Sequence, residues 1–159
     1  MKLVTYEEFL EFDPCWLEYE GGAERIKAYF DRFGGRMSAL DILNLDDISA
    51  EDKLWSVLRE EFIPAPILHE FACVCAECAL TLIDNPDPRS IKAVEIKRAW
   101  MRGEATDGEL AAARNAARAA SWHSSETAGR AGRAARAAGA MYEAQVAYLI
   151  MTLEETYGN

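Results

Sequence analysis

Helix start signals recur along almost the whole chain, and they constrain the fold more than any other feature. The signals are capping boxes and helix-capping residues. They occur at Thr5 with Glu8, Asp13 before Pro14, Ser38 with Asp41, Ser49 with Asp52, Asp87 before Pro88, and Thr106 with Glu109. No alternating apolar and polar run of strand length accompanies them. The sequence therefore predicts an all-α fold, a helical bundle with short N-terminal helices, a buried central helix and long alanine-rich C-terminal helices.

The length and apolar content indicate one core. A chain of 159 residues that is 50% hydrophobic has enough apolar surface for one substantial core and not for two. We expect a single domain over residues 1–159. Within it, residues 1–63 form an acidic helical part, and residues 65–156 form an alanine-rich helical part.

Two apolar stripes and one apolar segment predict where the core lies. Ile26, Tyr29, Phe30 and Phe33 follow helical spacing, and Gly34 and Gly35 end that helix. The helix capped by Ser49 carries a second stripe, formed by Leu54, Trp55, Leu58 and Phe62. Residues 67–83 are apolar almost all round, which is typical of a buried helix at the centre of a core.

The C-terminal region carries no strong helix-stop signal after Thr106. One helix of about 50 residues would be roughly 75 Å long, well beyond the diameter of a small domain. We expect a bend or break in the serine-rich patch from Ser121 to Thr127, which would give two long helices that fold back on one another. Whether the region is one bent helix or two helices stays open. Gly129, Gly132 and Gly139 disfavour helix by about 1 kcal/mol each, so close helix packing is their expected use.

The N-terminus and the cysteines predict a cytoplasmic protein. Acidic residues follow the single early lysine, so the basic and then apolar layout of a secretory signal is missing. The longest uncharged apolar run, residues 144–153, is about half the length needed to span a bilayer. Four cysteines in such a chain are expected to be reduced thiols.

Charge is distributed unevenly along the chain. The formal net charge is −10, which argues against general binding to nucleic acid or to an anionic membrane. Residues 1–88 hold 7 Lys and Arg against 19 Asp and Glu, a net of −12. Residues 89–159 hold 10 against 8, a net of +2. Such asymmetry indicates an interaction surface, or two parts of one protein that attract each other.

His69, Cys73, Cys75 and Cys78 have the residue types of a zinc site. Their spacing is poor for it, because Cys75 lies about 200° round a helix from Cys73, and four ligands on one regular helix cannot enclose a tetrahedral ion. Small apolar core thiols are the favoured interpretation, so no metal or cofactor is expected. An enzyme that uses His69 or His123 with a metal stays open as an alternative.

No catalytic site is assembled in the sequence. His123 has no nucleophile and orienting carboxylate fixed beside it, and it is expected to lie at a helix bend. Glycine-rich phosphate loops, dinucleotide fingerprints and zinc-protease motifs are not found. We expect a protein that is not an enzyme.

Two charged surfaces are candidate contact sites for a partner. The acidic residues serve as helix caps and solvated faces, or together imitate the phosphates of a nucleic acid. The arginines make local basic ridges, which either solubilise an apolar helix or contact an acidic partner. The acidic candidates are Asp46, Asp47, Glu51 and Asp52, and the arginines are Arg114, Arg118, Arg130, Arg133 and Arg136.

Two motifs carry a resemblance to a known family. Phe71 to Glu77 reads FACVCAE, and Trp100 to Glu104 reads WMRGE before an alanine-rich helix. Over residues 65–153 the chain resembles the alanine-rich immunity-protein family of bacterial toxin loci, phages and mobile elements. The usual alanine-tryptophan repetition of that family is interrupted here by residues 121–139. The resemblance implies an all-helical fold and a non-catalytic protective role, and it brings no catalytic residues.

Together these features favour a binding protein that neutralises or inhibits a macromolecular partner, such as a toxin, a nuclease or a component of a defence system. A phage-encoded anti-CRISPR or other anti-defence inhibitor, acting as an acidic mimic of nucleic acid, is the closest alternative. A nucleic-acid binder that uses the C-terminal arginines is a weaker one. The oligomeric state stays open.

Overall fold

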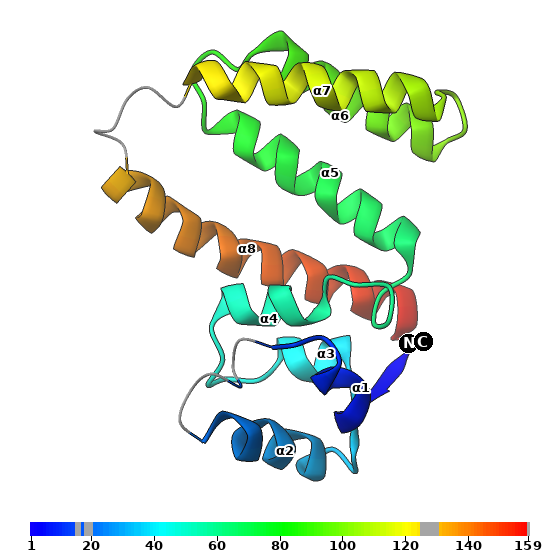
Figure 1. Ribbon diagram of the computed structural model, residues 1–159, viewed down its shortest axis with the longest axis vertical. Helices are drawn as coiled ribbons and strands as arrows, with labels where there is room; N and C mark the ends of the chain where they lie inside the picture. Colours follow the sequence, from blue (N-terminus) through cyan, green and yellow to red (C-terminus); the bar gives the residue numbers. More distant parts are fainter. Residues whose placement is uncertain (15–16, 18–20, 125–130, 159) are drawn as a thin grey trace. The chain divides into compact units, whose positions relative to one another are not determined.

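The protein is predominantly helical (Figure 1). The computed structural model describes residues 1–14, 17, 21–124 and 131–158, without the side chains of residues 120–124 and 131–140. Its elements are β1 (Leu3–Thr5), α1 (Tyr6–Leu10), α2 (Gly22–Arg32), β2 (Arg36–Ser38), α3 (Ala39–Leu43), α4 (Ala50–Val57), α5 (Ala65–Thr81), α6 (Pro88–Met101), α7 (Asp107–Ser124) and α8 (Ala131–Tyr157). The all-α prediction is confirmed. A short antiparallel pair of strands, β1 and β2, was not predicted.

The predicted caps lie at the helix starts. The Thr5 hydroxyl accepts a hydrogen bond from the backbone N–H of Glu8, whose carboxylate accepts one from the backbone N–H of Thr5. Ser38 with Asp41 and Thr106 with Glu109 repeat this reciprocal arrangement. Each pair satisfies N–H groups that have no partner within the helix. The second short helix expected after Asp13 falls largely outside the described residues.

The chain forms two compact units. Unit 1 comprises Met1–Ala65 and Gly139–Asn159, and unit 2 comprises Pro66–Ala138. The sequence had grouped the C-terminal residues with the alanine-rich part instead. Within unit 1, α8 lies alongside α4, and the two chain ends are close together (Figure 1). Val146, Leu149 and Leu153, which share one face of α8, are at most 5% exposed.

Unit 1 is built round an aromatic cluster. Phe9, Phe30 and Phe62 are each at most 2% exposed, and the Phe9 ring centroid lies 5.4 Å from that of Phe30 and 6.5 Å from that of Phe62. Val4 pairs with Met37 in the sheet, and both side chains are buried. The cluster therefore joins α1, α2 and the segment after α4.

Each of the two predicted stripes is only partly correct. In the first stripe Phe33 is 36% exposed, while its other three residues are buried. In the second stripe Leu54 and Phe62 are buried, but Trp55 is 37% exposed and Leu58 is 39% exposed. The helix ends at Val57, a turn earlier than expected, so Leu58 leaves the buried face. Arg59 lies over the ring of Trp55, with its guanidinium carbon 4.7 Å from the ring centroid.

Unit 2 contains α5, α6 and α7, and α6 and α7 pack side by side (Figure 1). The prediction that α5 is a fully buried hub is wrong. Phe71 and Cys73 are its buried residues, and no residue of α6 is buried. Part of the contact between α5 and α6 consists of the ion pairs that Arg98 forms with Glu70 and Glu77.

In the C-terminal region the structure describes two helices, α7 ending at Ser124 and α8 beginning at Ala131. Residues 125–130, which include Gly129, lie outside the described part, and so do the surroundings of Gly132 and Gly139. Among the residues described, no helix has the length and apolar content needed to cross a membrane.

Candidate functional site

The two units differ strongly in charge. Unit 1 holds 7 Lys and Arg against 18 Asp and Glu, a net of −11. Unit 2 holds 10 against 9, a net of +1. Most of the acidic excess that the sequence showed therefore belongs to one structural unit.

The four predicted acidic residues lie at the junction between α3 and α4 and divide into two pairs. Asp47 accepts hydrogen bonds from the Tyr29 hydroxyl at 2.5 Å and from Arg25 Nη2 at 3.2 Å. The hydrogen bond from Tyr29 is the main cause that lowers the pKa of Asp47, and Arg25 contributes to the same shift. Asp52 accepts a hydrogen bond from Ser49 Oγ at the start of α4. These two carboxylates have structural roles.

Asp46 and Glu51 are the other pair. Both are exposed, and neither takes part in an ion pair within the described residues. Glu51 lies in the first turn of α4, where a negative charge is favourable beside the helix N-terminus. These two side chains are free to meet a partner.

Other glutamates extend the acidic surface of unit 1. Among its described residues, Asp31 and Asp47 form ion pairs, with Lys27 and Arg25. Further exposed carboxylates without an ion pair in the described part are those of Glu7, Glu8, Glu11, Asp13, Glu24, Glu60, Glu61, Glu143, Glu154 and Glu155. The surface of unit 1 is therefore rich in uncompensated negative charge.

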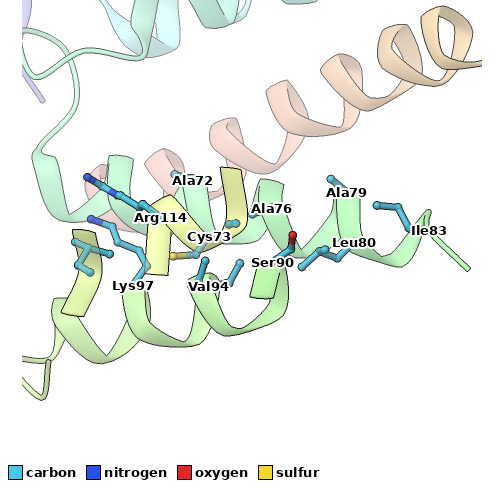
Figure 2. Close-up of a pocket in the computed structure, with 13 residues that line it drawn as sticks. Ala72, Cys73, Ala76, Ala79, Leu80, Ile83, Ser90, Val94, Lys97 and Arg114 are labelled. Carbon is cyan, nitrogen blue, oxygen red and sulfur yellow. The ribbon is translucent and has the colours of Figure 1, made fainter. Parts of the chain in front are cut away.

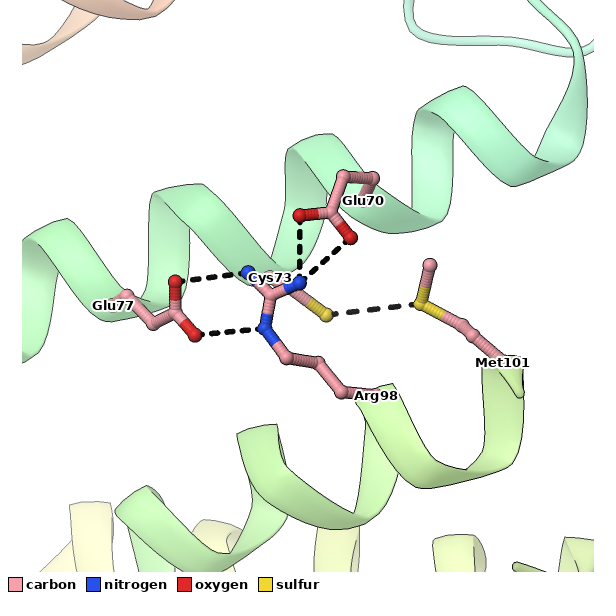
Figure 3. Close-up of polar contacts among 5 residues, drawn as sticks. All are labelled: Glu70, Cys73, Glu77, Arg98 and Met101. Carbon is pink, nitrogen blue, oxygen red and sulfur yellow. Dashed lines mark hydrogen bonds and ion pairs between the residues drawn. The ribbon is translucent and has the colours of Figure 1, made fainter. Parts of the chain in front are cut away.

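In unit 2, Arg98 joins α6 to α5 through two carboxylates (Figure 3). Its Nε donates to Glu77 Oε1 at 2.9 Å and its Nη2 to Glu77 Oε2 at 3.0 Å. Its Nη1 donates to both oxygens of Glu70, at 2.6 and 2.7 Å. The hydrogen bonds to Glu77, and then those to Glu70, raise the pKa of Arg98, while Arg98 lowers the pKa of Glu77. This Arg98 cluster links α6 to α5 and therefore has a structural role.

The two motifs of the family resemblance meet beside this cluster. Cys73 Sγ lies 4.0 Å from Met101 Sδ, and the ring centroids of His69 and Trp100 are 5.4 Å apart. Trp100 Nε1 donates to Asp107 Oδ1 at 2.7 Å, which ties the end of α6 to the start of α7. Gly103, with φ of 76°, makes the turn between them. The motif residues, together with His69 and Asp107, therefore link α5, α6 and α7.

The cysteines do not form the uniform core set that was predicted. Cys73 is buried, Cys75 is half-buried and Cys78 is exposed, so the prediction is wrong for Cys78. Burial raises the pKa of Cys73 and of Cys75. In the part of the chain described, no three His, Cys, Asp or Glu side chains are arranged to hold a metal ion. Cys15 lies outside that part.

Unit 2 has a groove between α5, α6 and α7 (Figure 2). Its volume is about 420 Å³, and most of its lining is alanine and other apolar side chains. Lys97 and Arg114 lie together at one end, whereas Ile83 lies at the other (Figure 2). Sequence reasoning singled out Arg114 but missed the groove and Lys97, because the lining comes from three separate helices.

The structure describes the remaining predicted site residues only in part. Arg118 lies on α7, one turn after Arg114. Arg130 is outside the described residues, as are the side chains of Arg133, Arg136 and His123. The structure therefore brings Arg114 together with Lys97, and it does not describe the ridge of Arg130, Arg133 and Arg136.

Comparison of the chain with protein-family models, with curated proteins and with solved structures found no match.

Proposed function

We propose that this protein is a non-catalytic binding protein that neutralises or inhibits a macromolecular partner, and that the acidic surface of unit 1 contacts a basic surface on that partner. A toxin, a nuclease or a component of a defence system is the expected class. A cytoplasmic location belongs to the same proposal, and the free thiols of Cys73, Cys75 and Cys78 are compatible with it.

The uncompensated charge of unit 1 carries the proposal. A net of −11 on one unit, with Asp46 and Glu51 exposed and outside any described ion pair, creates a field that attracts a basic surface. A nuclease is a suitable partner because it binds phosphates through such a surface. An inhibitor of a defence system that imitates nucleic acid would use the same carboxylates.

Binding of nucleic acid by unit 2 has less support. Arg89, Arg98 and Arg102 are each paired with a carboxylate. A paired guanidinium has to give up its partner before it contacts a phosphate. The described part of unit 2 therefore has few cations available for a polyanion.

The test is affinity capture of the tagged protein from cells that encode its natural gene neighbours, followed by mass spectrometry and a binding measurement with the purified partner. We expect a basic partner whose affinity falls at least tenfold in the variant that combines Asp46→Lys with Glu51→Lys, and falls further as salt is raised.

The matched control combines Asp84→Lys with Glu95→Lys, which changes the net charge equally on unit 2. We expect a smaller loss of affinity, because both positions are exposed and lie outside the acidic surface of unit 1. A partner that binds the first variant as tightly as the wild type, in low and high salt, would contradict the proposal. If Arg130→Glu, Arg133→Glu and Arg136→Glu together abolish binding instead, the arginine ridge is the contact.

A further inference from the structure

The groove of unit 2 has the features of a small-molecule site. Its volume of about 420 Å³ lies in the range of pockets that hold small ligands. Along α5, the lining runs from Ala72 to Leu80, a distance of about 12 Å at helical rise, and it continues to Ile83 just after the helix. Leu80, Val94 and Leu110 provide branched apolar contacts. Ser90 is the one lining residue that carries a hydroxyl group. An elongated apolar molecule fits such a surface.

Two cationic side chains make one end of the groove positively charged, so the two ends differ. Lys97 and Arg114 line the same end, and no carboxylate belongs to the lining (Figure 2). Neither cation forms an ion pair within the described residues; Lys97 Nζ instead lies 3.9 Å from the centroid of the Trp100 ring. Burial and the nearby positive charge of Arg114 lower the pKa of Lys97. An anion at this end would relieve that repulsion.

We propose that the groove binds a free amphipathic carboxylate of the medium-chain fatty-acid class, with the carboxylate between Lys97 and Arg114 and the acyl chain directed toward Leu80 and Ile83. Ammonium and guanidinium groups hold a carboxylate through charge-assisted hydrogen bonds. The alanines of the lining leave room for methylene groups and bring no competing polar atoms. This site is independent of the acidic surface of unit 1.

Calorimetric titration of the full-length protein with decanoate tests the proposal. We expect saturable binding of one decanoate per chain. Decanol and decyltrimethylammonium, which keep the chain and replace the carboxylate, should bind at least tenfold more weakly. Equal binding of all three ligands would overturn the proposal, and so would the absence of saturable binding.

Variants locate the site. Lys97→Gln and Arg114→Gln should each weaken decanoate binding about tenfold, the loss expected for one charge-assisted hydrogen bond. Lys92→Gln on the same helix is the matched control, because Lys92 is exposed and pairs with Glu95 away from the groove lining; it should bind like the wild type. Ala93→Leu should fill the groove and abolish binding while circular dichroism shows an intact helical signal.

Two results would reject this assignment. If Lys97→Gln and Arg114→Gln bind decanoate as tightly as the wild type, the cations do not hold the carboxylate. If light scattering shows that the protein dimerises and that Ala93→Leu disrupts the dimer without affecting decanoate, a second copy occupies the groove.

Discussion

Arg98 and Glu77 form a two-point ion pair between α6 and α5, with Nε to Oε1 at 2.9 Å and Nη2 to Oε2 at 3.0 Å. The remaining nitrogen of the same guanidinium binds Glu70, which lies two helical turns before Glu77 on α5. The planar fork of arginine suits this geometry, and a lysine would supply only a point charge. The Arg98 side chain therefore binds two carboxylates of α5.

Replacing Arg98 with methionine should destabilise the protein by about 1–2 kcal/mol, because hydrogen bonds to charged groups are lost while two carboxylates are left close together. Chemical denaturation monitored by circular dichroism measures the change. Arg102→Met is the control, because Arg102 pairs with Glu104 in a fully exposed position and should have little effect. Equal effects of the two substitutions would show that the Arg98 cluster has no special role.

The same pair should make stability depend on acid pH. Arg98 lowers the pKa of Glu77 from its ordinary value of 4.5, so the folded state binds that proton less readily than the unfolded state. The stabilisation is fully present above pH 4.5 and is lost as pH falls through the lowered pKa. The difference in free energy of unfolding between wild type and Glu77→Gln should therefore shrink from pH 7 toward pH 3. A difference that is constant over this range would contradict the linkage.

The three described cysteines should react with a maleimide at different rates. In a Cys15→Ser background at pH 7, Cys78 should be modified first because it is exposed, and Cys73 last because it is buried. Burial also raises the pKa of Cys73 and Cys75, which lowers their thiolate fraction. Peptide mass spectrometry over time gives the order. In denaturant the order should disappear, and a Cys73 as reactive as Cys78 in the native protein would show that α5 is more open than described.

Ser38 should be important for stability although it is small. It is 4% exposed, its Oγ donates to Asp41 Oδ2 at 2.6 Å, and it accepts from the backbone N–H of Asp41. Ser38→Ala should cost about 1–2 kcal/mol, the range for loss of an N-cap. Because the two residues form one network, the double variant with Asp41→Ala should lose less than the sum of the single losses. Thermal unfolding measures all three, and strict additivity would argue against coupling.

Helix starts that follow a capping signal could be predicted, because the hydrogen bonds that cap a helix are local. Ser38 reaches Asp41, and Thr106 reaches Glu109, within one turn of the chain, so neighbouring residues are enough to specify them. The ends at Gly34 and Gly103 are equally local, since both adopt positive φ, which glycine tolerates. Two strands of three residues were missed because Val4 and Met37 pair across a long separation and show no periodicity of their own.

The candidate surfaces likewise depend partly on local sequence and partly on contacts between distant residues. The sequence alone placed Asp46, Asp47, Glu51 and Asp52 in an acidic region, but their hydrogen bonds, including that from Tyr29 to Asp47, separated structural carboxylates from free ones. Arg114 stood out in the sequence as part of a basic ridge, and only the packing of α6 against α7 placed it beside Lys97.

By itself, the sequence determined the helical class, most of the helix starts and the uneven charge, since each depends on composition or on residues within about one turn of one another. Tertiary structure decided which faces are buried, which carboxylates are paired and where a groove forms. Arg98 reaches Glu77 across 21 positions and Glu70 across 28, and the lining of the groove comes from three helices. Such contacts depend on how whole helices pack, which local periodicity does not encode.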